Sequence, residues 1–166
     1  MRTELGPGPD SEVAASFVAT AADGGKTVDA DAAALATQVI RGYPYLLQLV
    51  GSKAWALSEM RSGSTISLVD VSNARRPIID QLGQQVHKIA LRQVPDGERD
   101  YLEAMATVAE SSGLPVTTEA VAQQIGKAQS QLTGVRHRLI ERDLIVAPRR
   151  GQLEFRLPYL GEYLLA

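Results

Sequence analysis

Apolar residues along the chain recur mostly three and four residues apart, which is the spacing that gives an α-helix one buried side. The clearest case lies between Ala128 and Arg142. There, four aliphatic residues share one side of the predicted helix: Leu132, Val135, Leu139 and Ile140. Apart from Ala128 and Gly134, polar residues occupy the other positions. This stretch is therefore predicted to be an amphipathic surface helix.

The first half of the chain predicts several further helices. One is expected over residues 42–59, with Pro44 in its first turn, where the missing N–H of proline costs nothing. Another apolar stripe runs over residues 77–91. Pro77 is expected either to start that helix or to kink it.

The second half changes from helix to strand. A short helix over residues 118–126 ends at Gly126 and is followed by the amphipathic helix at 128–142. Two apolar runs at 144–147 and 153–157, joined by a turn that contains proline, arginine and glycine, predict a β-hairpin. The order helix, turn, helix, strand, turn, strand is that of a winged helix-turn-helix.

Proline and glycine mark the divisions of the chain. Residues 1–10 carry two Gly-Pro steps and predict a flexible N-terminus. The Val94-Pro95-Asp96-Gly97 stretch predicts a boundary between a helical subdomain, 11–94, and a winged-helix domain, 95–166. The expected fold class is mainly α with a small β-hairpin wing, and the apolar C-terminal residues 158–166 should fold back onto the core.

Composition narrows the possible chemistry. The chain has no cysteine and two widely separated histidines, His87 and His137, so no metal site and no cofactor are expected. No apolar run is long enough for a membrane span and no signal peptide opens the chain, so we expect a cytoplasmic protein without membrane contact.

The charge is unevenly distributed. Residues 127–156 hold seven basic and three acidic residues, a net charge of +4, whereas the whole chain has a formal charge of -2. The remainder therefore sums to -6. One basic segment in a weakly acidic protein favours a focused nucleic-acid contact over general binding of polyanions.

The winged unit supplies the candidate contacts with double-stranded DNA. In such a unit the second helix enters the major groove, and its outward side must carry short hydrogen-bonding side chains. The residues of the 128–142 helix predicted to face the groove are Gln129, Ser130, Thr133, His137 and Arg138. Two basic residues, Lys127 and Arg142, are predicted to contact phosphates. At the tip of the wing, Arg149 and Arg150 are predicted to reach a phosphate or the minor groove.

Four segments together resemble the C-terminal half of bacterial P-loop ATPases of the AAA+ and signal-transduction (STAND) groups. They are GYPYLLQLVG at 42–51, ERDYLEAMA at 98–106, VRHRLIERDLIVAPRRGQLEFRLP at 135–158 and LGEYLL at 160–165. In those ATP-binding proteins, origin-recognition ATPases included, a helical lid and a winged helix follow the ATPase core. The resemblance covers nearly all of the chain after residue 10 and implies that residues 11–94 correspond to the lid.

The chain departs from this family in the motifs that bind ATP and magnesium. It contains no Gly-x-x-x-x-Gly-Lys-Ser/Thr loop, and no apolar strand ends in paired acidic residues. The nearest glycine cluster, ADGGK before Thr27, lacks the first glycine. We therefore expect no enzymatic activity from these residues. We interpret them as a fragment or remnant of a larger ATPase, whose core is in the same or another chain.

Two other functions remain open on the sequence. In the first, the winged helix is instead a protein-interaction or autoinhibitory module that regulates a P-loop ATPase core without binding DNA. The acidity outside 127–156 and the apolar tail LPYLGEYLL favour that reading. The second is self-association through the lid half, which the apolar helix at 42–59 suggests. If the winged helix does bind DNA, the chain would suit a transcription regulator.

Overall fold

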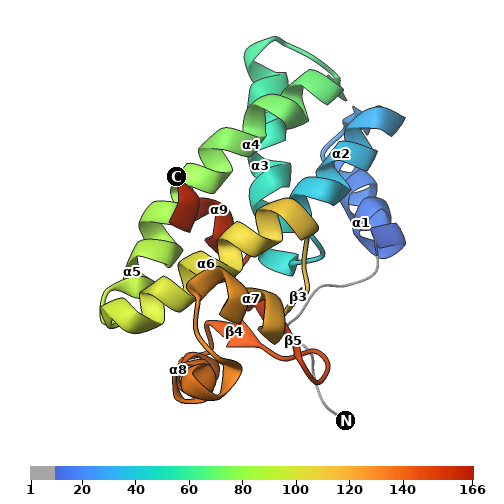
Figure 1. Ribbon diagram of the computed structural model, residues 1–166. Coiled ribbons are helices and arrows are strands. Elements are labelled where there is room, and N and C mark those ends of the chain that lie inside the picture. The colour runs from blue at the N-terminus through green and yellow to red at the C-terminus, as the bar shows by residue number, and fades with distance from the viewer. Residues whose placement is uncertain (1–9) are drawn as a thin grey trace. The chain divides into compact units, whose positions relative to one another are not determined.

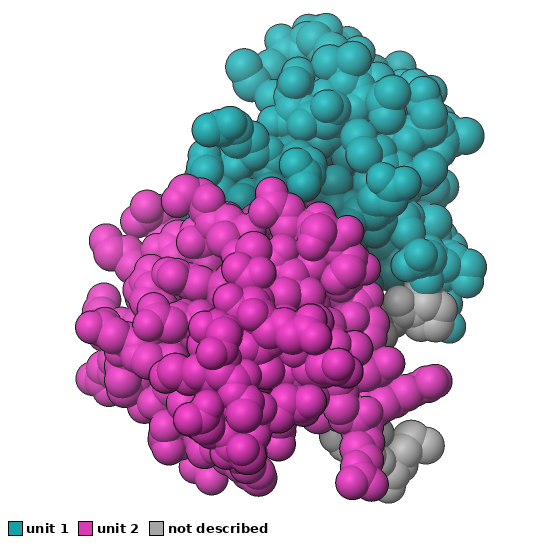
Figure 2. Space-filling view, viewed as in Figure 1, with its two compact units in different colours: residues 1–80 teal, residues 81–166 magenta. Residues whose placement is uncertain are grey.

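The computed structural model describes residues 10–166, and the chain divides into two compact units, residues 1–80 and residues 81–166 (Figure 2). The predicted flexible segment lies outside the described residues, except for Asp10, which is the first residue of helix α1. Helices dominate both units and short strands accompany them (Figure 1). The predicted fold class, mainly α with a small β wing, is confirmed.

Unit 1 is a group of helices around an aliphatic core. Its helices are α1 (Asp10–Asp23), α2 (Ala30–Ile40), α3 (Pro44–Met60) and most of α4 (Leu68–Leu82). The helix predicted at 42–59 is thus present as α3, with Pro44 in its first turn. Each helix contributes buried side chains, among them Phe17, Ile40, Leu46, Val50 and Ile78.

Two short strands in unit 1 were not predicted. Strand β1 (Thr27–Val28) pairs in parallel with β2 (Thr65–Ile66), with Thr27 opposite Thr65. Strands of two residues show no alternation of apolar and polar positions, so the sequence pattern cannot reveal them. The pair joins the loop after α1 to the loop after α3.

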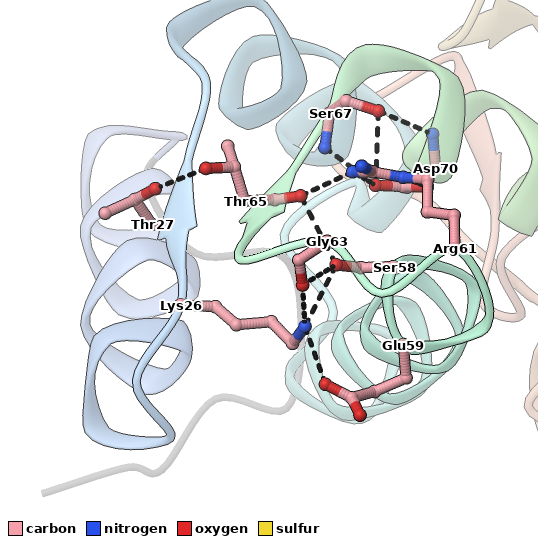
Figure 3. A network of polar contacts seen from close by, with 9 residues as sticks. All are labelled: Lys26, Thr27, Ser58, Glu59, Arg61, Gly63, Thr65, Ser67 and Asp70. Atoms are coloured by element: carbon pink, nitrogen blue, oxygen red, sulfur yellow. Dashed lines mark hydrogen bonds and ion pairs between the residues drawn. The ribbon is translucent and has the colours of Figure 1, made fainter.

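A buried lysine reinforces this junction of loops. The Nζ atom of Lys26 donates to the Ser58 hydroxyl at 3.1 Å and to the Gly63 carbonyl, and it pairs with Glu59 at 2.7 Å (Figure 3). The same ammonium lies 4.9 Å from the ring centroid of Trp55. Lys26 is 5% exposed, and a charge this deeply buried is tolerated only when it is paired and hydrogen-bonded. The network therefore ties the ADGGK loop to the end of α3.

A second ion pair fixes the start of α4. The Arg61 guanidinium donates to both carboxylate oxygens of Asp70, at 3.1 and 2.6 Å (Figure 3). The Ser67 N–H donates to Asp70, and the Asp70 N–H donates to the Ser67 hydroxyl, as in a capping box. Arg61 foremost, and then the Ser67 donors, lower the pKa of Asp70 to about 2 against the opposing effect of burial.

We expect Asp70→Asn to lower the free energy of unfolding by about 1–2 kcal/mol at neutral pH, since an amide cannot replace the ion pair. A carboxyl whose pKa is depressed by folding stabilises the fold above its unfolded pKa. That contribution disappears as the pH falls toward about 2. Urea unfolding at pH 7 and pH 2.5 measures this difference. Asp80→Asn, at an exposed position of the same helix, is the control and should change neither value. The difference should be clearly smaller at pH 2.5 than at pH 7, and an equal difference at the two pH values would contradict the ion-pair account.

The stretch predicted as a helix from Pro77 instead begins nine residues earlier and is continuous. Helix α4 contains Pro77 in its interior and runs directly into a π-helical turn, η1 (Gly83–His87), and then α5 (Lys88–Leu91). A π-turn adds a residue to the helical period and so shifts which side chains face inward. His87 is therefore buried, whereas Ile89, an apolar residue within the predicted stripe at 77–91, is 56% exposed.

Unit 2 is built on α6. Besides η1 and α5, its other elements follow in chain order as β3 (Val116–Thr117), α7 (Thr118–Ile125), α8 (Gln129–Glu141), β4 (Ile145–Val146), β5 (Gln152–Phe155) and α9 (Leu160–Leu165). Helix α6 (Asp96–Ser112) buries Tyr101, Leu102 and Met105, and it contacts α7, α8 and α9. The predicted hairpin is present as β4 and β5. An unpredicted strand, β3, adds to it in the antiparallel order β3-β5-β4.

The C-terminal tail packs against unit 2, as predicted. Tyr159 and Leu160 are 2% and 0% exposed. The His87 ring lies 5.1 Å from the ring of Tyr163 in α9, and its Nε2 atom is 2.7 Å from the Pro158 carbonyl. The two units accordingly divide at residues 80 and 81, earlier than the boundary predicted at Val94–Gly97, because η1 packs with the tail.

His87 is buried in its neutral form. A carbonyl only accepts hydrogen bonds, so Nε2 carries the hydrogen that Pro158 receives, and the buried Nδ1 has no partner in the described residues. Burial lowers the pKa of His87, and the Pro158 carbonyl and Glu162 oppose that shift. Protonation would thus place an unpaired N–H in the core.

Acidification below about pH 6.5 should therefore destabilise the protein, because the unfolded chain binds a proton there that folded His87 resists. We expect His87→Phe to abolish this loss. The variant should be less stable by about 1–3 kcal/mol at pH 7.5, since the buried Pro158 carbonyl loses its donor. Thermal unfolding at pH 7.5 and pH 5.5 measures both effects. His137→Gln, at the exposed second histidine, should keep the wild-type pH dependence.

Candidate nucleic-acid interface

The α7–turn–α8 segment is fixed by local interactions that its sequence supplies. The Thr117 hydroxyl caps α7 by accepting from the Ala120 N–H at 3.0 Å. Gly126 ends α7 in the left-handed conformation, with φ 84°. The Gln131 side chain then accepts from the Ala128 N–H at 3.1 Å, immediately before α8 begins at Gln129. The helix predicted at 128–142 is confirmed, with its two end residues as caps.

Packing determines which side of α8 faces solvent. Leu132 and Leu139 are buried in the core of unit 2, and Val135 and Ile140 are partly buried against the same core. These are the four residues predicted for the apolar side. The opposite side is consequently exposed along the length of the helix.

All nine predicted contact residues are exposed. Gln129, Thr133 and His137 are spaced four residues apart and lie in one row along α8. Ser130 and Arg138 belong to the neighbouring row. The exposed polar surface of α8 thus has the composition that hydrogen bonding to bases or phosphates requires.

Some of these side chains already have partners. The Thr118 hydroxyl donates to the Gln129 side-chain oxygen at 3.0 Å, which leaves the Gln129 amide group as a donor. The Thr133 hydroxyl donates to the Gln129 backbone carbonyl at 3.3 Å. By contrast, the structure gives no hydrogen bond or ion pair to the side chains of Ser130 and His137 within the described residues. Among the five predicted groove residues, those two are the least constrained.

Arg138 and Arg142 bind an acidic residue that the sequence did not link to them. Glu98 of α6 is 4% exposed and accepts from Nε of Arg138 at 3.3 Å and from Nε of Arg142 at 2.8 Å. In the sequence, Glu98 is one of several carboxylates near the start of a helix, where capping and interaction with the helix dipole are the usual roles. No side-chain cap is present there, because Pro95 occupies the N-cap position. The spacing of the two arginines is visible in the sequence, but their common partner is not.

The wing and the turn before α8 add three further basic groups. Arg149 and Arg150 lie in the turn between β4 and β5, which closes with a Gln152 N–H bond to the Arg149 carbonyl at 3.0 Å. Lys127 lies in the turn that leads into α8. All three are exposed, and none of their side chains forms an ion pair in the part of the chain that the structure describes. Glu141 is also exposed near the end of α8 and opposes this positive charge.

Among residues 10–166, no cluster of three or more acidic or histidine side chains is placed to hold a metal ion. Nor is any helix in that range both long and apolar enough to cross a membrane.

Comparison with known proteins adds one sequence match and several structural ones. A family model described as a domain of unknown function (DUF8462) matches residues 84–164, which are nearly all of unit 2. No curated protein matches the chain.

The structural matches include RuvB from Thermotoga maritima, described as a Holliday junction branch migration motor, with 16% identity and a TM-score of 0.44. The match covers 94% of this chain and 49% of the RuvB chain. A Drosophila ORC structure bound to DNA matches with 16% identity and a TM-score of 0.38, covering 96% of this chain and 44% of that one. The present chain therefore spans about half the length of these proteins. Similarity at this level does not transfer a ligand or an activity.

We expect Gly126→Ala to lower the free energy of unfolding by about 1–2 kcal/mol, because an alanine there must adopt the left-handed conformation. A methyl group at Gly126 meets no atom within 4 Å, so the cost comes from the backbone alone. Thermal or urea unfolding measures it. Gly97→Ala is the matched control: it is equally open but helical, and should not destabilise the fold. Equal losses in the two variants would contradict the backbone explanation.

Proposed function

We propose that unit 2 binds double-stranded DNA, with α8 in the major groove and the β4–β5 wing against the backbone or the minor groove. One observation carries this proposal: every predicted contact residue is exposed, and all of them belong to α8, its flanking turns and the wing. Unit 2 is accordingly interpreted as a winged helix-turn-helix.

The chemistry of the α8 surface supports a groove contact. Ser130, Thr133 and His137 offer hydroxyl and imidazole groups that can donate or accept, and Gln129 keeps a free amide donor. No large apolar side chain projects from this side of the helix. A short polar surface of this kind suits the floor of the major groove.

The charge distribution supports a backbone contact. The net charge of +4 over residues 127–156 is concentrated in α8 and the wing, in a chain whose overall charge is negative. Arg149 and Arg150 project from a turn between two strands, the position from which a wing reaches DNA beside the groove. Lys127 precedes α8 and suits a phosphate.

On this proposal the described residues bind and do not catalyse. An ATPase core, in the same or another chain, would supply nucleotide control. The alternative is a regulatory module that does not bind DNA, which the apolar tail and the acidity outside residues 127–156 favoured. Tyr159 and Leu160 of that tail are buried within unit 2, so they are not available as a docking surface. The acidity of the rest of the chain still favours this alternative.

Fluorescence anisotropy with a labelled duplex, at about 50 and 200 mM salt, tests the proposal. We expect binding at low salt that weakens as salt rises. Replacing both Arg149 and Arg150 by alanine should weaken binding to all sequences alike and reduce the slope of log K against log salt by about 2.

The double variant Arg75→Ala and Arg76→Ala is the matched control, since it removes two adjacent positive charges from exposed positions in unit 1. It should leave both the affinity and the salt slope close to wild type. Absence of binding at low salt would overturn the proposal, as would equal effects of the two double variants.

A further inference from the structure

The buried carboxylate of Glu98 holds two arginines in a particular way. Each of its oxygens accepts from the Nε of a different arginine, Oε2 from Arg138 and Oε1 from Arg142. The carboxylate side chain is 5% exposed, whereas the arginine side chains are 54% and 37% exposed. The acid is thus inside unit 2, and the two guanidinium groups extend from it toward solvent.

Binding through Nε leaves most of each guanidinium available. A guanidinium has five N–H donors, and four of them belong to the two terminal nitrogens. The structure gives no hydrogen bond from those terminal nitrogens of Arg138 or Arg142 within the described residues. Arg142, the C-cap residue of α8, follows Arg138 by one helical turn. Because both Nε atoms bind the same carboxylate, the terminal groups of the two arginines are neighbours. The Glu98–Arg138–Arg142 group carries a net charge of +1.

A glycine leaves room for one of these guanidinium groups. A Cβ atom added to Gly134 would lie 3.2 Å from Nη1 of Arg138. Arg138 therefore lies back along α8 over Gly134, in space that any other residue would partly fill. Glycine is unfavourable within a helix, so its presence in α8 needs a local reason, and the position of Arg138 is one.

A purely structural role does not account for this arrangement. A buried ion pair adds little to stability once the cost of desolvation is counted. One arginine would also neutralise Glu98, and the second gives an uncompensated positive charge at the surface. Paired guanidinium groups whose donors are held in fixed directions are suited to the oxygens of a phosphate.

We infer that Arg138 and Arg142, held by Glu98 and with space provided by Gly134, form a binding site for a phosphate group of the DNA backbone. Glu98 is then a positioning residue for DNA binding. Arg138 contacts the backbone instead of a base edge, because its Nε is held toward α6. This inference rests on the proposed function of unit 2.

The decisive variant is Glu98→Gln, because two explanations predict opposite results. Removing a negative charge near DNA should tighten binding if only overall electrostatics matters. If Glu98 positions the arginines, the Kd should instead rise by about tenfold, the equivalent of one charge-assisted hydrogen bond. The slope of log K against log salt should also fall by about 1, since one phosphate contact is lost.

Glu110→Gln is the matched control, since it removes the same charge from an exposed position of the same helix. It should bind at least as tightly as wild type.

Gly134→Ala and Arg138→Lys provide tests that leave Glu98 in place. Alanine favours the helix, so the first variant should keep the wild-type melting temperature or exceed it, yet bind DNA more weakly. Lysine keeps the charge, but its three donors are on a single nitrogen. It therefore cannot offer a phosphate two parallel donors while it pairs with Glu98, and this variant should also bind DNA more weakly.

The outcomes separate the inference from the proposed function. If the wild-type protein binds DNA and the Glu98→Gln and Gly134→Ala variants bind it more weakly, both the proposed function and the phosphate site are supported. If the wild-type protein binds DNA and these variants bind it equally well or more tightly, the phosphate site is overturned and the proposed DNA binding stands. Absence of wild-type binding at low salt overturns the proposed function and the site with it. If Glu98→Gln fails to fold, as thermal unfolding would show, the Gly134→Ala and Arg138→Lys results decide.

Discussion

The burial of one side of α6 is the constraint on which unit 2 depends. Tyr101, Leu102 and Met105 are almost fully enclosed, and α7, α8 and α9 each pack against this helix. Leu132 and Leu139 of α8 must face the same core. Because an α-helix presents residues every 100° around its axis, this packing turns Ser130 and His137 outward. The orientation of the proposed DNA-binding surface therefore follows from the packing of the core.

The same helix also carries the main polar contact of that surface. Glu98 is in the first turn of α6 and is buried, so its charge must be neutralised from a neighbouring element. Arg138 and Arg142 provide this neutralisation from α8. Apolar burial thus sets which side of α8 faces solvent, and an ion pair sets the direction of two of its arginines.

Unit 1 combines an aliphatic core with buried polar groups at its loops. Lys26 and Asp70 are 5% and 4% exposed, and each is satisfied by partners from the end of α3 and the loop that follows it. These contacts fix the loops that carry β1 and β2. The two strands have two residues each, and their few hydrogen bonds would not hold these loops in place alone.

The sequence by itself determined the parts of this protein that depend on local chemistry. The apolar stripe of α8, the turn at Gly126, the β-hairpin and the first-turn Pro44 were all predicted from residue type and spacing. Only the tertiary structure decided the rest: β3, the π-turn that buries His87, and the partners of the buried charges. Glu98 is forty residues from Arg138, and His87 is 71 residues from Pro158. No periodicity connects positions so far apart, because their contact depends on how whole helices pack.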